Sequence, residues 1–240
     1  MAAEDKVALV TGAGRGIGRT TARALSREGF RVALVARTGP ELDEVARELE
    51  ADGGEALVLP CDVTDAEGVG LALRKTIERF SRLDVVVNNA GVAEEHPFRE
   101  LQFDELDRVL QVTLRGTLVV TRAALPYLLQ QGEGAAVVNI ASLAGRRPVR
   151  GAAVYTAAKH GVVGFAEALF EEVRETGLKV CTILPGLVDT PASAGATAAQ
   201  RARMIAPEDV ADAVLWALSA SPRTCPAEIV LRPQRSPFRG

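Results

Sequence analysis

The sequence has few of the features that mark secreted, metal-bound or membrane-spanning proteins. Aromatic residues make up 4% of the 240 residues, and the three cysteines are Cys61, Cys181 and Cys225. An odd number of cysteines without metal-ligand spacing argues against a disulfide framework and favours a reducing, cytoplasmic setting. No apolar run approaches the roughly 20 residues that cross a bilayer. The start, MAAEDK, is acidic, so we expect no secretory signal and no membrane partner.

The chain also lacks an excess of charge of either sign. It carries 28 basic and 31 acidic residues, for a net charge of −3. Such a balance provides no basic surface for nucleic acid, so no nucleic-acid partner is expected. Hydrophobic residues make up 48%, enough for one sizeable core. We therefore predict one domain over residues 1–240, with its core at about 6–233 and a loose C-terminal tail.

Short apolar runs alternate with helical patterns throughout the chain. The runs predict strands at residues 6–12, 31–37, 55–63, 83–91, 134–142, 178–186 and 227–233. Helices are expected at 17–28, 39–54, 65–80, 103–131, 154–176 and 207–219. Strict alternation with unbroken apolar strands predicts an α/β fold, a single doubly wound parallel sheet with helices on both faces. The segment 191–203 is weakly patterned and is expected to be a surface loop or short lid.

A glycine-rich turn, VTGAGRGIGRT, lies between the first expected strand and the first expected helix. Gly12, Gly16 and Gly18 allow a sharp turn and let backbone amides approach an anion at the helix N-terminus. Glycine is common in any tight strand–helix turn, so the turn alone is a weak sign. Its place between a strand and a helix favours a dinucleotide-binding site.

The segment NIASLAGRRPVRGAAVYTAAKHG, residues 139–161, contains no acidic residue but holds Ser142, Tyr155 and Lys159. Residues four apart share a helix face, so Lys159 should lie beside Tyr155. A free tyrosine titrates near pH ~10. One ammonium at ~4 Å, at an effective dielectric of about 20, favours the phenolate by roughly 4 kcal/mol. That would lower the tyrosine pKa by about three units. A nearby carboxylate would cancel the effect, although a Tyr–Lys pair alone is common on helix surfaces.

Four motifs together resemble the short-chain dehydrogenase/reductase family, from Lys6 to about Pro233. They are TGxxxGIG ending at Gly18, NNAG ending at Gly91, Tyr-x-x-x-Lys ending at Lys159, and PGLVDT ending at Thr190. The resemblance implies a Rossmann fold, hydride transfer between a nicotinamide nucleotide and a small alcohol or carbonyl compound, and a homodimer or homotetramer.

The resemblance also implies residue roles. Tyr155 exchanges a proton with the substrate oxygen, Lys159 lowers the tyrosine pKa and binds the nicotinamide ribose, and Ser142 hydrogen-bonds the substrate oxygen. Asp62 corresponds to the adenine contact, and Val188 and Thr190 to the carboxamide clamp. No metal ligand is expected. The implied cofactor-binding residues are Gly12, Arg15, Gly16, Ile17, Gly18, Arg37, Asp62, Val63, Asn89, Ala90, Gly91, Tyr155, Lys159, Pro185, Gly186, Val188 and Thr190.

The end of the second expected strand favours NADP(H) over NAD(H). A carboxylate about 20 residues past the glycine turn would bind the adenosine ribose diol. The chain has Ala36 and Arg37 there, with no carboxylate until Glu41. Arg15 supplies a second guanidinium for the 2′-phosphate of NADP, and two forked donors bind a phosphate well. The alternative is that both arginines are ordinary surface residues.

One position departs from the family pattern, because Thr113 stands where an asparagine usually helps to hold the water of a proton relay. The shorter hydroxyl predicts a shifted or missing water. The substrate is left open: the C-terminal PEDVADAVLWAL resembles members that act on β-hydroxy acids or hydroxy amino acids, and 3-oxoacyl compounds are a further candidate. The rival interpretations are a non-catalytic NADPH-binding sensor or scaffold and, less favoured by the short chain, a dehydratase or epimerase.

Overall fold

The computed structural model describes residues 5–94 and 96–238. Their centre is a seven-stranded sheet in the order β3-β2-β1-β4-β5-β6-β7, and every neighbouring pair is parallel. The apolar runs expected to form strands do so. The strands are β1 (Val7–Thr11), β2 (Arg31–Ala36), β3 (Ala56–Pro60), β4 (Val85–Asn88), β5 (Ala136–Ile140), β6 (Lys179–Pro185) and β7 (Glu228–Leu231).

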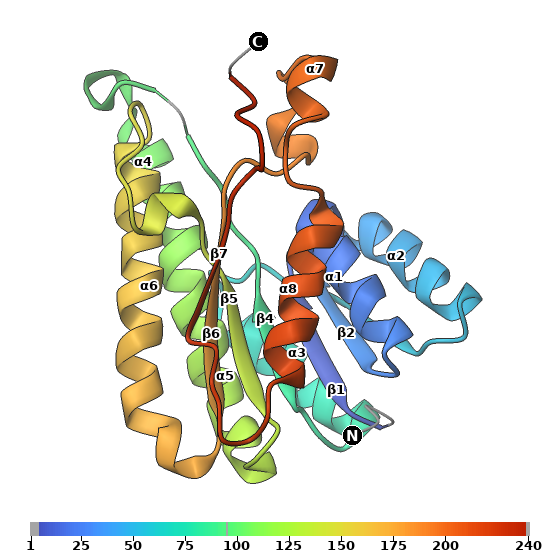
Figure 1. The fold of residues 1–240 in the computed structure, drawn as a ribbon. Helices are drawn as coiled ribbons and strands as arrows, with labels where there is room; N and C mark the ends of the chain where they lie inside the picture. The colour runs from blue at the N-terminus through green and yellow to red at the C-terminus, as the bar shows by residue number, and fades with distance from the viewer. Residues whose placement is uncertain (1–4, 95, 239–240) are drawn as a thin grey trace.

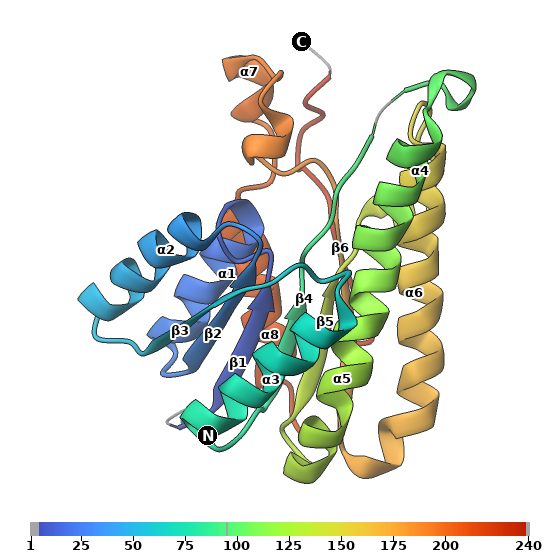
Figure 2. The same cartoon turned by 180° about the vertical axis from the view of Figure 1, so that it is seen from behind.

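Helices cover both faces of this sheet (Figures 1 and 2). One face packs against α1 (Gly16–Arg27), α2 (Gly39–Ala51) and α8 (Pro207–Ser219). The other packs against α3 (Ala66–Phe80), α5 (Gly116–Gln131) and α6 (Ala153–Val173). Because side chains alternate along a strand, Ala8 and Val10 enter the first core and Val7 and Leu9 the second. The doubly wound α/β sheet predicted from the alternating pattern is confirmed.

Two helix ends show how the local sequence sets the boundaries. Asp65 precedes α3, and its side chain accepts a hydrogen bond from the Glu67 N–H, so it is the helix N-cap. Ser81 ends the same helix with φ +65°, the left-handed conformation that closes many helices. Because Asp65 is the N-cap of α3, Asp62 is not needed for that role.

The stretch expected to be one long helix, 103–131, is helical but not uniform. It begins as α4 (Phe103–Val109), passes through a π-helical segment, η2 (Leu110–Arg115), and continues as α5. A π turn inserts an extra residue and is found mostly at functional sites. Here the insertion surrounds Thr113, the position that departs from the family pattern.

The segment 191–203, expected to be a surface loop or short lid, contains the short helices η5 (Pro191–Ser193) and α7 (Ala198–Arg201). Trp216 on α8 is 59% exposed, so its side chain lies at the surface and not in the core. Of the expected tail, residues 236–238 are described and 239–240 lie outside the described residues. No helix in the described parts of the chain is long and apolar enough to cross a membrane.

Candidate active site

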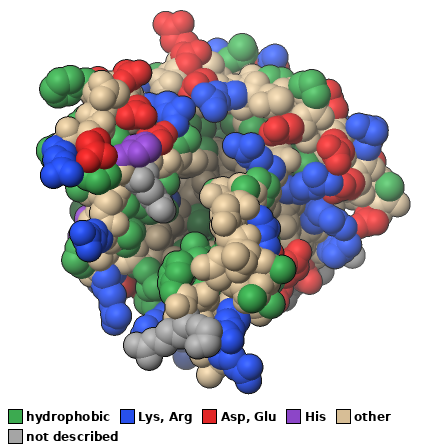
Figure 3. Space-filling view, turned by 90° about the horizontal axis from the view of Figure 1, so that it is seen from above, with side chains coloured by type: hydrophobic (Ala, Val, Ile, Leu, Met, Phe, Trp, Pro, Cys, Tyr) green, Lys and Arg blue, Asp and Glu red, His purple; other side chains and the backbone are tan. Residues whose placement is uncertain are grey.

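All the predicted motifs meet at one edge of the sheet. Because the strands are parallel, their carboxyl ends lie together, at the top of Figure 1. The order changes direction between β1 and β4, and ligands of open α/β sheets bind at such a switch point. Figure 3, seen from above, shows the surface hollowed here, with hydrophobic side chains in the hollow and Lys and Arg on its rim.

The glycine turn after β1 is packed too tightly for other residues. Gly12 has φ +64°, and a Cβ there would lie 2.8 Å from the Asn89 Nδ2. A Cβ on Gly18 would lie 2.1 Å from the Gly12 carbonyl oxygen. Gly16 has φ +54°, and a Cβ there would lie 3.5 Å from the Thr190 side chain on the other side of the crevice. Ile17 is half-buried against the first core. The turn therefore presents backbone, not side chains, at the start of α1.

Two asparagines at the end of β4 hold this edge together. Asn88 is buried and donates hydrogen bonds to the Thr121 Oγ1 (2.8 Å) and the Asn139 Oδ1 (2.9 Å), so it ties β4 to β5 and α5. The Asn89 Nδ2 donates to the carbonyl oxygens of Thr11 (2.9 Å) and Gly12 (3.2 Å). Asn88 thus has a structural role, while the Asn89 side chain braces the glycine turn.

Lys159 is the buried charge of the site. Its side chain lies on α6, its Nζ donates to the Ile140 carbonyl oxygen at 2.8 Å, and its exposure is 6%. Burial lowers the pKa of Lys159 from 10.5 to about 8, a cost of roughly 3 kcal/mol to the charged form. The Nζ lies 5.7 Å from the centre of the Tyr155 ring. The Tyr-x-x-x-Lys spacing therefore does place an ammonium beside the phenol.

Ser142 follows β5 and caps the short helix η3 (Leu143–Gly145). Its Oγ accepts a hydrogen bond from the Ala144 N–H at 3.1 Å, so the hydroxyl hydrogen can still be donated elsewhere. A Cβ on Gly145 would lie 2.9 Å from the Lys159 carbonyl oxygen. Glycine at this position lets η3 pack directly on α6, which brings Ser142 to the helix that carries Tyr155.

Thr113 is buried, and its hydroxyl both donates and accepts a hydrogen bond. It donates to the Val92 carbonyl oxygen at 2.9 Å and accepts from the Val92 N–H at 3.0 Å. A Cβ on Gly91 would lie 3.6 Å from the Thr113 Oγ1 and 3.8 Å from the Lys159 Nζ. Thr113 therefore fixes the chain after Ala90 and Gly91 next to Lys159, a role that the sequence did not indicate.

The glycine turn and the end of β2 form a second, charged part of the crevice. Arg15 and Arg37 are both exposed, and neither takes part in an ion pair with any residue of the described ranges. Glu41 is closer than the sequence suggested, because its Oε2 would lie 2.8 Å from a Cβ on Gly14. The Glu41 carboxylate therefore lies against the glycine turn, which contains Arg15, while Arg37 follows the end of β2.

The turn after β3 contains Asp62 and Val63. The Asp62 Oδ1 accepts from the N–H and the hydroxyl of Thr64, at 2.9 and 2.8 Å, which leaves the Oδ2 for another donor. Val63 is buried, and a Cβ on Gly116 would lie 2.7 Å from its Cγ2. The Val63 side chain therefore belongs to the core, and any contact with a ligand would be through its backbone.

The turn after β6 is closed by bonds on both sides of Val188. The Asp189 N–H donates to the Ile205 carbonyl, and the Ile205 N–H to the Leu187 carbonyl. Among the described residues the Val188 N–H has no backbone partner. Earlier in this turn, Pro185 ends β6, and the Gly186 N–H donates to the Leu231 carbonyl oxygen.

The segment beyond this turn is held by Arg201. Its Nη1 contacts the Asp189 Oδ1 at 2.5 Å, and its other nitrogens donate to the carbonyls of Ser193, Ala194 and Ala196. One guanidinium on α7 thus joins η5, α7 and the turn that carries Thr190. Sequence reasoning missed this contact, because its partners lie twelve residues apart in a weakly patterned segment.

Known proteins are similar to this chain along nearly its whole length. A family model described as short chain dehydrogenase matches residues 6–201. An uncharacterized oxidoreductase of Staphylococcus epidermidis is 36% identical over 230 residues, 96% of this chain and 98% of the relative. One of Staphylococcus aureus is 38% identical over 229 residues, 95% of this chain and 97% of the relative.

Solved structures also match along nearly the whole chain. A metagenomic short-chain oxidoreductase in complex with NADP has a TM-score of 0.85 and 32% identity, covering 98% of this chain and 100% of its own. A variant of the actinorhodin polyketide ketoreductase with NADPH has a TM-score of 0.88 and 34% identity, covering 97% of both chains.

Proposed function

The chain belongs to the short-chain dehydrogenase family, and we propose that within it the protein is an NADP(H)-dependent oxidoreductase that interconverts a small secondary alcohol and its ketone. The observation that carries this proposal is the buried Lys159 ammonium beside the Tyr155 ring, at the edge where β1, β4 and β5 end. Among the described residues no carboxylate forms an ion pair with Lys159, and a buried cation without one is costly to hold, which is typical of a functional site.

The residues around the crevice fit NADP(H). The glycine turn offers backbone amides to the diphosphate, and the exposed Arg15 and Arg37 offer two guanidinium groups to the 2′-phosphate. The Val188 N–H is available for the carboxamide. Two solved relatives contain NADP or NADPH, which supports the same choice. Bound NADP(H) would supply or accept the hydride.

The chain's own residues would manage the proton. Tyr155 gives its hydroxyl proton to the substrate oxygen during reduction and takes one back during oxidation. Lys159 stabilises the phenolate by its charge, because its buried ammonium lies beside the Tyr155 ring, where water screens the charge less. Ser142 donates its hydroxyl hydrogen to the substrate oxygen, since its Oγ already accepts from Ala144.

The substrate would lie between two raised segments. The chain after β4, with α4, and the segment with η5 and α7 rise above the sheet edge on opposite sides (Figures 1 and 2). Arg146, beside η3, donates to Glu228 through its Nε at 3.0 Å and is ion-paired with Glu167. With its charge used in this way, Arg146 is a poor receptor for a substrate carboxylate. A small neutral alcohol or ketone, or one whose acid group is held elsewhere, therefore fits better.

The test replaces the reacting hydroxyl alone. After NADPH oxidation has been screened with ketones, β-keto esters, quinones and aldehydes, Tyr155→Phe should lower kcat by about 10²–10⁴-fold. NADPH binding, measured by fluorescence titration, should change little. In the unmodified protein kcat/KM should also fall as pH rises through about 8, because Lys159 then loses its proton.

Two outcomes would contradict the proposal. If Tyr155→Phe kept its rate on a confirmed substrate, Tyr155 would not be the proton donor. If NADPH bound tightly while no compound in the panel was turned over, the protein would instead be a nucleotide-binding sensor or scaffold. Equal affinity for NADH and NADPH would contradict only the choice of cofactor.

A further inference from the structure

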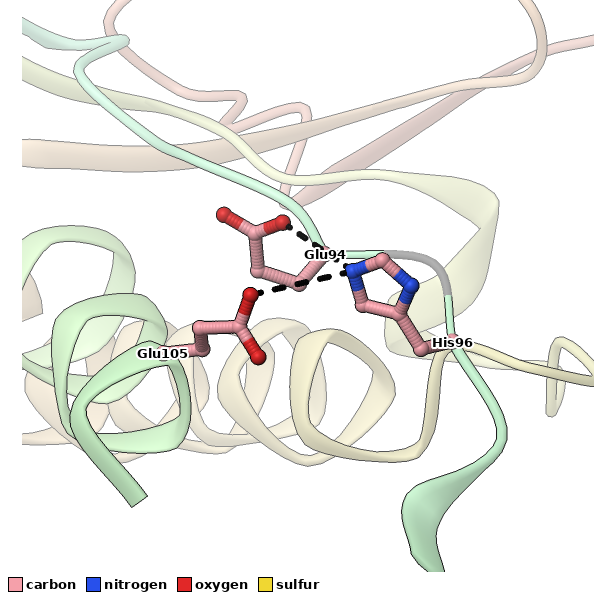
Figure 4. Close-up of side chains that lie close together, drawn as sticks. All are labelled: Glu94, His96 and Glu105. Atoms are coloured by element: carbon pink, nitrogen blue, oxygen red, sulfur yellow. Dashed lines mark ion pairs between the residues drawn. The ribbon is translucent and has the colours of Figure 1, made fainter. Parts of the chain in front are cut away.

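Three side chains from two separate segments point toward one another beside the crevice. Figure 4 shows Glu94 and His96, from the chain after β4, facing Glu105 on α4. The His96 Nε2 lies 3.6 Å from the Glu94 Oε2 and 3.9 Å from the Glu105 Oε1. One ligand atom of each residue lies within 4.8 Å of the others. We refer to these residues as the Glu–His–Glu cluster.

Each carboxylate in the Glu–His–Glu cluster has one oxygen held by the protein and the other turned inward. The Glu94 Oε1 is ion-paired with Arg108, while its Oε2 faces His96. The Glu105 Oε2 accepts from the Gln102 N–H at 2.9 Å, while its Oε1 faces His96. Partners of this kind orient ligands in metal sites and are part of what makes a site selective. Glu94 is also only 17% exposed, so one ligand is already partly removed from water.

The two separations from His96 are close to those around a single small cation. Ligands at about 2.1 Å from a tetrahedral ion lie about 3.4 Å from one another, and the His96 Nε2 lies 3.6 and 3.9 Å from the two carboxylate oxygens. All three ligand atoms lie within 4.8 Å of one another. With His96 neutral, two carboxylates and the Arg108 guanidinium leave one net negative charge. One imidazole and two carboxylates are a donor set for Zn²⁺ and similar transition ions, whereas Mg²⁺ and Ca²⁺ prefer oxygen alone.

We propose that Glu94, His96 and Glu105 form a binding site for one divalent transition cation such as Zn²⁺, with water completing its coordination. The bound cation would join the chain after β4 to α4, and so fix one wall of the crevice. The proposal does not depend on the redox activity, because it requires no nucleotide. The residue spacing predicted no metal, since Glu105 lies eleven positions beyond Glu94 on another element; the fold brings the ligands together.

The chain provides matched controls, because it has only two histidines. Zn²⁺ is titrated into the full-length protein by calorimetry, with Mg²⁺ as the comparison ion. His96→Ala and Glu105→Gln remove cluster ligands. His160→Ala removes the other histidine, which is exposed on α6, and Glu100→Gln removes an exposed carboxylate nearby that pairs only with Arg99 among the described residues. Far-UV circular dichroism without added metal establishes that each variant is folded.

The unmodified protein should bind one Zn²⁺ per chain, and His96→Ala and Glu105→Gln should each weaken binding at least tenfold. His160→Ala and Glu100→Gln should bind as before. Affinity should fall in acid, because protons compete with the cation for its ligands. Zn²⁺ should also raise the melting temperature of the unmodified protein and not of His96→Ala.

The proposal is overturned if the unmodified protein shows no saturable binding of one Zn²⁺. It is equally overturned if a folded His96→Ala variant binds Zn²⁺ within threefold of the original affinity, since cysteines or scattered carboxylates would then be the ligands. Mg²⁺ binding as tight as Zn²⁺ binding would rule out the imidazole as a ligand.

Discussion

The two sides of the crevice are built in different ways. On the side of the proposed nucleotide site, called the nucleotide side below, the glycine turn leaves no room at Gly12 or Gly18 for even a methyl group, and Asn89 binds its backbone directly. On the substrate side, the raised segments are held by side chains that meet through charge, as in the contact of Arg201 with Asp189. The first side is specified by backbone geometry and the second by long side chains.

This difference predicts how each side tolerates change. A backbone contact has no conservative substitute, because any added atom displaces the chain. A half-exposed ion pair contributes about 0–1 kcal/mol and can be replaced or moved. We therefore expect the nucleotide side to be sensitive to single atoms and the substrate side to be adaptable. The substitutions below test this contrast, from the largest expected effect to the smallest.

The largest effect is expected from one methyl group in the glycine turn. In Gly18→Ala the new Cβ would lie 2.1 Å from the Gly12 carbonyl oxygen and 2.5 Å from the Asn89 Nδ2. Overpacking of this kind should lower the free energy of unfolding by about 1–3 kcal/mol and abolish measurable NADPH binding. Chemical denaturation and fluorescence titration measure the two effects.

Gly70→Ala is the matched control for that substitution. Gly70 lies on α3, and its nearest neighbour would be the mobile end of Arg74 at 3.5 Å. Alanine there should stabilise the protein by up to about 1 kcal/mol without changing NADPH binding. Normal nucleotide binding by Gly18→Ala would show that the turn can move, and the contrast between the two sides would be lost.

A smaller effect is expected from Arg37, which acts by charge on the nucleotide side. Arg37→Asp should weaken NADPH binding about tenfold to hundredfold, the loss of a charge-assisted hydrogen bond worth roughly 1.5–3 kcal/mol. NADH, which lacks the 2′-phosphate, should bind almost as before. Glu41→Gln should act in the opposite direction and strengthen NADPH binding, because its carboxylate lies against Gly14 in the same turn.

Arg47→Asp is the control, since it makes the same change of charge on the exposed part of α2. Among the described residues, Arg47 bonds only the Asp43 carbonyl oxygen within its own helix. If Arg37→Asp and Arg47→Asp weakened NADPH and NADH equally, the effect would be one of general charge, and Arg37 would have no specific role.

The smallest effect should come from the substrate side. Arg201→Ala removes the ion pair with Asp189 and the bonds to the carbonyls before α7. Because side chains of both residues are about one-third exposed, the substrate KM should rise only about twofold to fivefold, with kcat nearly unchanged. Arg174→Ala, which removes an exposed pair on another part of the surface, should leave KM as it was. A fall in kcat as large as that expected for Tyr155→Phe would make Arg201 part of the chemistry.

Much of the fold could be predicted from the sequence because its signals are local. The five inner strands β2, β1, β4, β5 and β6 are apolar runs that are buried along most of their length. The parallel order then requires the motifs after β1, β4, β5 and β6 to share one edge. Tyr155 and Lys159 lie on one helix, so their proximity follows from helix geometry alone. The spacing of four residues was sufficient to predict it.

Other features could not be predicted, because they depend on residues that only the fold brings together. The bonds of Thr113 to Val92 cross between an interrupted helix and the chain after β4. The π-helical turn at Leu110–Arg115 has no compositional sign. His160 is exposed on α6, and its Nδ1 lies 2.9 Å from the Thr156 carbonyl oxygen. For such residues the sequence gives the type of side chain, but only the fold determines which residues lie beside it.

The bonds from Asn89 to Thr11 and Gly12 also have a consequence for biosynthesis. They join residues 78 and 77 positions apart, so this brace of the glycine turn is missing until β4 has been made and has paired with β1. Contacts of such high sequence separation form late and slow folding. An N-terminal fragment that ends before Asn89 would therefore emerge from the ribosome with its glycine turn bonded to β2 alone, and the proposed nucleotide site would be complete only after that point.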